Sequence, residues 1–146
     1  MPVPVAQVQA VFQQFSAGFS KRDADAVMSL FVHDDSVFVF DVVGPPRQYV
    51  GWDAYLKDLQ HFFAALKAPL HHSVKDLSIT ISGDVAYTHS IQEVRGEFTN
   101  GTPYRADVRV TDVLRRLDDK WLFVQEHISV PVDSKTVMRS TDLYSL

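Results

Sequence analysis

Apolar side chains recur at helical spacing in the first part of the chain. Between residues 5 and 19 they lie three or four positions apart, which places them on one face of a helix. A second amphipathic helix is predicted over residues 23–32, with Asp23 as its N-cap because its carboxylate can accept from free backbone amides. A third helix is predicted over residues 52–66, before Pro69. Residues 36–43, rich in β-branched and aromatic side chains, predict a strand between the second and third helices.

The second half of the chain is typical of strands. Asn100-Gly101 is a strong signal for a two-residue hairpin turn, and residues 118–120 indicate a second turn. Strands joined by short turns form an antiparallel meander. We therefore predict one α+β domain over residues 1–146, with a core at 5–132 and a C-terminal tail at 133–146, in which the helices pack on the sheet. The strands of the meander are expected at 71–82, 85–99, 103–117 and 121–132.

The turns predict which side chains face one another. A two-residue turn at Asn100-Gly101 places His89 opposite Asp112, and a three-residue turn at 118–120 places Asp112 opposite Glu126. All three groups would then lie in a row on the more apolar face, together with Tyr87. Because buried charges are costly and close carboxylates raise one another's pKa, such a row is a candidate functional site. The alternative is a structural network, or side chains at a wet end of the sheet.

The same register places His127, Ser129 and Arg109 on the other face of the sheet. There they would make a dimer contact or surface hydrogen bonds. If the last turn had two residues instead of three, His127 would face Asp112 and join the pocket. His127 and Arg109 are therefore second candidates for the site.

Composition and charge argue against several classes of protein. The net charge is −4 with no long basic run, which disfavours nucleic acid as a partner. There is no cysteine, so disulfides, thiolate metal sites and cysteine nucleophiles are excluded. His71 and His72 are adjacent on a strand and point to opposite faces, and no spacing matches a metal-ligand motif, so we predict no metal site. No phosphate loop and no G-x-G-x-x-G motif is present, and no cofactor is predicted. Without a signal-peptide pattern or an apolar run of membrane-spanning length, a cytoplasmic protein without a membrane partner is expected.

Four stretches together resemble a known family. They are "FVHDDSVFVFDVVGPPRQYVG" (31–51), "GDVA" (83–86), "RVT" (109–111) and "KWLFVQEHISVP" (120–131). The chain resembles the SnoaL-like, ketosteroid-isomerase-like branch of the nuclear transport factor 2 superfamily over about residues 5–132. The resemblance implies a cone-shaped barrel, with three N-terminal helices on a strongly curved, mostly antiparallel sheet and a deep apolar pocket. It also implies a homodimer formed through the sheet.

The resemblance also implies roles for single residues. Asp41 matches the position of the proton-abstracting aspartate of ketosteroid isomerases, whereas Phe15 stands where those enzymes have an oxyanion-binding tyrosine. Asp112 falls at or within one residue of their second oxyanion acid. Glu126 falls near a catalytic aspartate of limonene-epoxide hydrolases. With His89 as a positioning or relay group, these three carboxylates are the candidate catalytic residues.

The sequence thus predicts a domain that binds a small, largely apolar molecule in a deep pocket. Carboxylate acid/base catalysis of the isomerase, dehydratase or hydrolase type is the expected activity. The alternatives are a non-catalytic ligand-binding module and a dimerisation module. The side chains expected to form the pocket walls are Phe15, Trp52, Tyr55, Tyr87 and Ile128.

Overall fold

The computed structural model describes residues 2–42, 44–132 and 134–135, so most of the predicted tail at 133–146 lies outside the described residues. The helices are α1 (Val3–Ser20), α2 (Ala24–Met28) and α3 (Trp52–Ala64). The strands are β1 (Phe38–Phe40), β2 (Tyr49–Val50), β3 (His71–Ser82), β4 (Val85–Glu97), β5 (Pro103–Leu117) and β6 (Lys120–Ser129). The three helices, the early strand and the four long strands follow the predicted order; the short strand β2 was not predicted.

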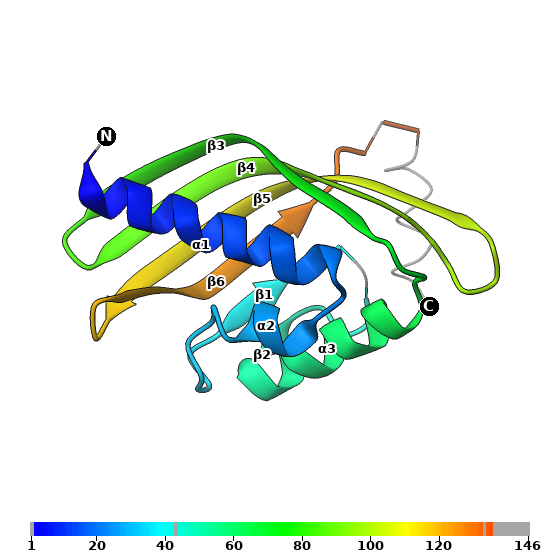
Figure 1. The fold of residues 1–146 in the computed structure, drawn as a ribbon, viewed down its shortest axis with the longest axis horizontal. Coiled ribbons are helices and arrows are strands. Elements are labelled where there is room, and N and C mark those ends of the chain that lie inside the picture. Colours follow the sequence, from blue (N-terminus) through cyan, green and yellow to red (C-terminus); the bar gives the residue numbers. More distant parts are fainter. Residues whose placement is uncertain (1, 43, 133, 136–146) are drawn as a thin grey trace.

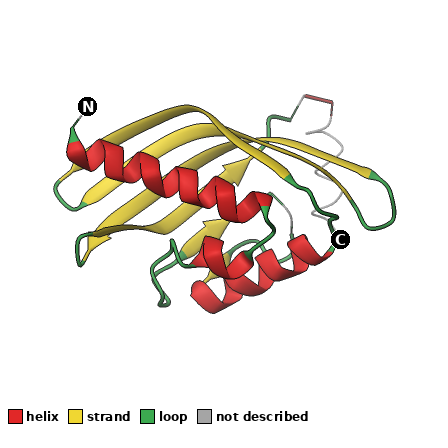
Figure 2. Ribbon diagram, viewed as in Figure 1, coloured by secondary structure: helices red, strands yellow, loops and turns green. Residues whose placement is uncertain are grey.

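All six strands form one sheet in the order β2-β1-β6-β5-β4-β3. Strands β3 to β6 are the predicted antiparallel meander, and β1 adds to β6 in the parallel direction. The sheet curves around α1, which runs across its concave face, while α2 and α3 lie near the β1–β2 edge (Figure 1). Figure 2 shows that the helices all cover the same face of the sheet. The predicted α+β class and curved sheet are confirmed; the sheet is curled and does not close.

The helices form where the spacing of apolar residues predicts them. The buried residues of α1 include Val8, Phe12, Phe15 and Phe19, which are spaced by three or four positions and face the sheet. Phe12 meets Phe123 of β6 edge to face, with ring centroids 5.2 Å apart. Helix α2 starts at the predicted N-cap, but it ends at Met28 and is shorter than expected. No helix among the described residues is long and apolar enough to cross a membrane.

The hairpin between β4 and β5 differs from the prediction by one residue. Its loop contains three residues, Thr99 to Gly101, and Gly101 takes a positive φ of 91° that favours glycine. Because Glu97 therefore pairs with Pro103, the register shifts and Thr88, not His89, lies opposite Asp112. The predicted His89–Asp112 pair is wrong.

The hairpin between β5 and β6 contains two deviations that cancel. Its turn has two residues, Asp118 and Asp119, whose positive φ angles of 49° and 62° are typical of a type I′ turn. That shorter turn alone would shift the register by one residue. A β-bulge that leaves Val124 unpaired shifts it back, so Asp112 lies opposite Glu126. The predicted Asp112–Glu126 pair is confirmed.

Four side chains named in the prediction lie on the convex face of the sheet. Two of them, His89 and Tyr87, were expected on the concave face, and the observed register turns them outward. His89 is exposed and Tyr87 is 54% exposed on this outer face. His127 also faces outward, as predicted, with its ring 5.1 Å from that of Phe40. Arg109 donates from Nε to Ser129 Oγ over 3.1 Å, on the same face. None of these four side chains of the sheet reaches the concave face.

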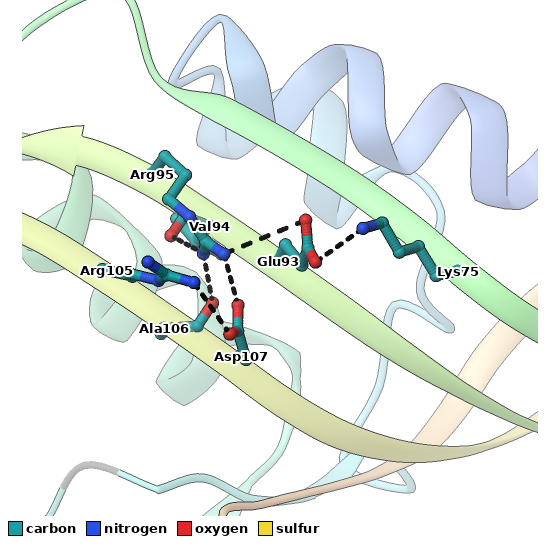
Figure 3. A network of polar contacts seen from close by, with 7 residues as sticks. All are labelled: Lys75, Glu93, Val94, Arg95, Arg105, Ala106 and Asp107. Atoms are coloured by element: carbon teal, nitrogen blue, oxygen red, sulfur yellow. Dashed lines mark hydrogen bonds and ion pairs between the residues drawn. The ribbon is translucent and has the colours of Figure 1, made fainter.

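A network of charged side chains covers part of the outer face (Figure 3). Lys75 on β3 pairs with Glu93 on β4 at 2.7 Å. Arg95 on β4 pairs with Asp107 on β5 at 2.7 Å and donates to the backbone carbonyl of Ala106. These basic groups are therefore engaged on the surface, away from the interior carboxylates described next.

Candidate functional site

A cavity of about 310 Å³ lies between the helices and the concave face of the sheet. Its walls are mainly apolar and aromatic, as is usual for small-molecule sites. Phe15 on α1, Tyr55 on α3 and Ile128 on β6 line it, at the positions expected for wall residues. Trp52 does not: it stacks on His33 at 3.7 Å and donates from Nε1 to a backbone carbonyl. Tyr87 does not line the cavity either, because it faces outward from the sheet.

Three carboxylates from three different elements line the same cavity. Asp41 directly follows β1, Asp58 comes from the middle of α3, and Glu126 comes from β6. Asp112 is buried on β5, directly opposite Glu126 on β6. No lysine or arginine of the described residues lines the cavity. The site therefore gathers acidic groups in an apolar environment, with the imidazoles of His61 and His72 but no lysine or arginine of the described residues in its walls.

Asp41 is poised to change its protonation state near neutral pH. Burial, a hydrogen bond with Asp58 and the charge of Asp58 raise the pKa of Asp41 to about 7. The backbone amide of Val42 donates to Asp41 Oδ1 over 2.7 Å and opposes this rise. Asp58 in turn is held by the Tyr49 hydroxyl, which donates to its Oδ1 over 2.8 Å. Asp41 can therefore both accept and return a proton at physiological pH.

Glu126 and Asp112 form a second, fully buried carboxyl pair. They are 3% and 1% exposed, and the Tyr55 hydroxyl donates to Glu126 Oε1 over 2.8 Å. Neither oxygen of Asp112 has a hydrogen-bond donor among the described residues. Burial and the charge of Glu126 hold the pKa of Asp112 well above its usual range, and burial also raises the pKa of Glu126. The environment of the pair therefore favours the protonated form of at least one of the two carboxyl groups.

A third polar group lines the cavity on the β3–β4 side. His72 Nε2 and Gln92 Oε1 are 2.9 Å apart, and His72 Nδ1 and Ser16 Oγ on α1 are 2.6 Å apart. Gln92 Nε2 also donates to Ser90 Oγ over 3.3 Å. Burial lowers the pKa of His72, so its ring is neutral at physiological pH. A neutral imidazole with one donor and one acceptor fits both partners.

The sequence analysis missed Asp58, His72 and Gln92 as site residues. Asp58 lies three positions after Tyr55 on α3, and side chains at that spacing share a helix face, so the signal was present. In the predicted register Gln92 falls on the face opposite to that of His89, which is the outer face; the one-residue shift turns it inward. His72 enters the sequence-based prediction only as a possible metal ligand. Among residues 2–42, 44–132 and 134–135, no three histidine, aspartate or glutamate side chains are grouped to hold a metal ion.

Solved structures share this fold at low sequence identity. An NTF2-like protein of unknown function from Pseudomonas putida KT2440 is 20% identical with a TM-score of 0.77, covering 90% of this chain and 89% of its own. A proposed scytalone dehydratase from Novosphingobium aromaticivorans is 18% identical with a TM-score of 0.78, covering 89% and 85%. A proposed NTF2-like dehydratase from Streptomyces avermitilis is 19% identical with a TM-score of 0.76, covering 89% and 97%.

The sequence itself also matches a family. No curated protein matches the chain. The family model described as the SnoaL-like domain matches residues 8–133, which include most of α1, the helices α2 and α3, and all six strands. That span contains every carboxylate of the cavity and the His72–Gln92 pair. The chain belongs to the SnoaL-like domain family.

Proposed function

We propose that this protein catalyses proton transfer on a small, largely apolar molecule, with Asp41 as the general base. The observation that carries the proposal is a carboxyl group with a pKa of about 7 in the wall of an apolar cavity. A general acid or base works best when its pKa lies near the working pH. Two similar folds bear the name of dehydratases, which also move protons, and this agrees with the proposal.

The remaining carboxyl pair supplies the second proton-carrying group. Asp41 would take a proton from a carbon next to a carbonyl, and the electron pair would move toward the carbonyl oxygen. Glu126 lines the cavity and, in its protonated form, would donate a hydrogen bond to the developing negative charge. In an isomerisation Asp41 returns the proton to another carbon. In a dehydration Glu126 gives its proton to the leaving hydroxyl, so that water departs as the double bond forms.

An exchange experiment tests this proposal without knowledge of the natural substrate. 2-Tetralone has acidic hydrogens between its ring and its carbonyl, and their replacement by deuterium in D₂O is followed by NMR. The wild-type protein should accelerate the exchange, and Asp41→Asn should lose about 100-fold or more of that acceleration. Asp119→Asn makes the same chemical change in an exposed turn and should keep it. Unchanged exchange by Asp41→Asn would remove Asp41 from the mechanism.

A second candidate function is binding of the same kind of molecule without catalysis. Phe15 lines the cavity with an apolar ring and offers no hydroxyl where related isomerases have one. A protein that binds 2-tetralone but leaves its exchange rate unchanged would fit this alternative. The homodimer through the sheet stays a prediction; the exposed Val85 and Tyr87 on the outer face are consistent with it.

A further inference from the structure

We infer that the cavity selects a neutral ligand that carries an oxygen acceptor at the end remote from Asp41, and that the side-chain amide of Gln92 binds this acceptor. The inference rests on the proposed function, since it places the reacting end of the ligand at Asp41. It adds a specificity-determining residue and a substrate class: an apolar body with oxygen atoms at both ends.

The side-chain amide of Gln92 has one hydrogen-bond donor without an acceptor among the described residues. Its side chain is buried, with 6% exposure, and it lines the cavity. A carboxamide nitrogen carries two hydrogens. One points to Ser90 Oγ over 3.3 Å, which is longer than a typical bond of this kind, and the second has no acceptor among the described residues. Buried donors in native proteins are nearly always paired, so an acceptor supplied by a ligand would complete this one.

The orientation of the Gln92 amide is fixed by its neighbours. His72 Nε2 donates to Gln92 Oε1, and His72 Nδ1 accepts from the Ser16 hydroxyl. The imidazole is itself held between the rings of Phe15 and Phe19, with centroids 5.4 and 4.7 Å from its own. With the oxygen of Gln92 occupied, the nitrogen is the atom left to meet a ligand. His72 is thus a positioning residue, which acts through Gln92.

The sheet sets the two polar ends apart. Asp41 follows β1 and Gln92 is on β4, with β6 and β5 between them in the sheet. Three strand spacings correspond to roughly 14 Å along the sheet. Between them, Val108 and Val110 of β5 and Ile128 of β6 line the cavity with apolar groups. A ligand that reaches from Asp41 to Gln92 therefore needs an apolar middle part where it passes these three side chains.

The acidic groups of the cavity disfavour anionic ligands. Its walls contain the carboxyl groups of Asp41, Asp58 and Glu126 and the imidazoles of His61 and His72, and no lysine or arginine of the described residues. A ligand carboxylate or phosphate would meet three acidic groups and, among the described residues, no permanently charged basic group. A ketone, alcohol or ether oxygen can accept from Gln92 without bringing a charge. The structure thus favours a neutral ligand such as a cyclic ketone with a second oxygen substituent.

Two matched probes test the inference. 6-Methoxy-2-tetralone differs from 2-tetralone by a methoxy group, which adds an ether oxygen and a methyl group on the far side of the ring. Calorimetry with the wild-type protein should show about 3- to 10-fold tighter binding of the methoxy compound, the effect of one hydrogen bond. In Gln92→Leu this preference should vanish, while Gln125→Leu, the same change on the outer face of β6, should keep it. Equal affinities for the wild-type protein, or a preference that survives Gln92→Leu, would overturn the inference.

A second measurement needs no variant to fold. The side-chain amide resonances of Gln92 in ¹⁵N-labelled wild-type protein should shift more with the methoxy compound than with 2-tetralone. Identical shifts, or no binding of either compound at millimolar concentration, count against the inference. Asp41→Asn separates it from the proposed function: the variant should keep the binding preference and lose exchange. If the wild-type protein fails to accelerate exchange but keeps the preference, the proposed catalysis fails and the binding site stands.

Discussion

Glu126 lies directly opposite Asp112 across the β5–β6 strand pair, and both carboxyl groups are almost completely buried. Two ionised carboxylates at this separation would repel one another in a medium of low dielectric constant. Tyr55 donates to Glu126, yet no donor among the described residues reaches Asp112. The pair is therefore tolerable only when it shares at least one proton, which makes it a source of instability at high pH.

Asp112→Asn should stabilise the protein increasingly as the pH rises. At alkaline pH the wild-type pair loses its shared proton and its two charges repel, whereas the amide stays neutral and can donate to Glu126. We expect the difference in the free energy of unfolding to reach about 1–3 kcal/mol in urea denaturation at alkaline pH. The gain should shrink as the pH falls, because the raised pKa of Asp112 keeps the wild-type carboxyl protonated there. A gain that does not increase between about pH 6 and about pH 10 would contradict this description of the pair.

Asp41 makes stability depend on pH in a definite direction. Its pKa rises from 3.8 to about 7 on folding, so the folded state binds a proton that the unfolded state releases between pH 4 and 7. The contribution of Asp41 is therefore full below pH 4 and is lost as pH rises through 7. Asp41→Asn should match the wild type near pH 4 and exceed its free energy of unfolding by about 2–4 kcal/mol at pH 8. Asp119→Asn should reproduce the wild-type slope; an equal slope in Asp41→Asn would disprove the assignment.

Tyr55→Phe should destabilise the protein, because Glu126 loses the hydroxyl that donates to it over 2.8 Å. A hydrogen bond to a charged or strongly polarised group contributes about 1.5–3 kcal/mol, and the loss should appear as a lower urea midpoint at pH 7.5. Tyr104→Phe is the matched control, since Tyr104 lines the same cavity and no hydrogen-bond partner of its hydroxyl is found among the described residues. Equal losses in the two variants would show that the Tyr55–Glu126 bond contributes nothing specific.

The sequence allowed prediction of the fold class, but the exact register depended on turn geometry. Asp112 and Glu126 were paired correctly because the two-residue turn at Asp118-Asp119 and the bulge at Val124 cancel. The other hairpin has no compensating bulge, so its three-residue loop moved His89 to the surface. A bulge leaves no clear mark in a run of apolar residues, and one residue of slip exchanges the two faces of a strand.

The polarity of β4 reinforced that error. Its outward-facing residues include Val85 and Tyr87, whereas its buried face carries Thr88, Ser90 and Gln92. The usual rule that the more apolar face of a strand is buried therefore predicted the wrong face of β4 as the buried one. This inversion is physically reasonable where a strand lines a cavity, because a binding site needs polar groups that face inward.

The turn at Asp118-Asp119 offers a test of the register itself. Both residues have positive φ, which asparagine and glycine adopt more easily than aspartate. Replacing the pair by Asn-Gly should raise the free energy of unfolding by about 0.5–1 kcal/mol, seen as a higher thermal midpoint. If the turn had three residues instead, the glycine would only add conformational freedom to the unfolded chain, and the thermal midpoint would fall.

With a pKa of about 7, Asp41 carries a proton in about half of the molecules at neutral pH. The direct test is an NMR titration of the side-chain carboxyl carbons in protein labelled with ¹³C-aspartate, with Asp41→Asn used to assign the Asp41 signal. The midpoint of the Asp41 signal should lie near pH 7. A midpoint below about pH 5, close to that of an ordinary aspartate, would mean that Asp41 is fully ionised at physiological pH and holds no proton to return to a substrate.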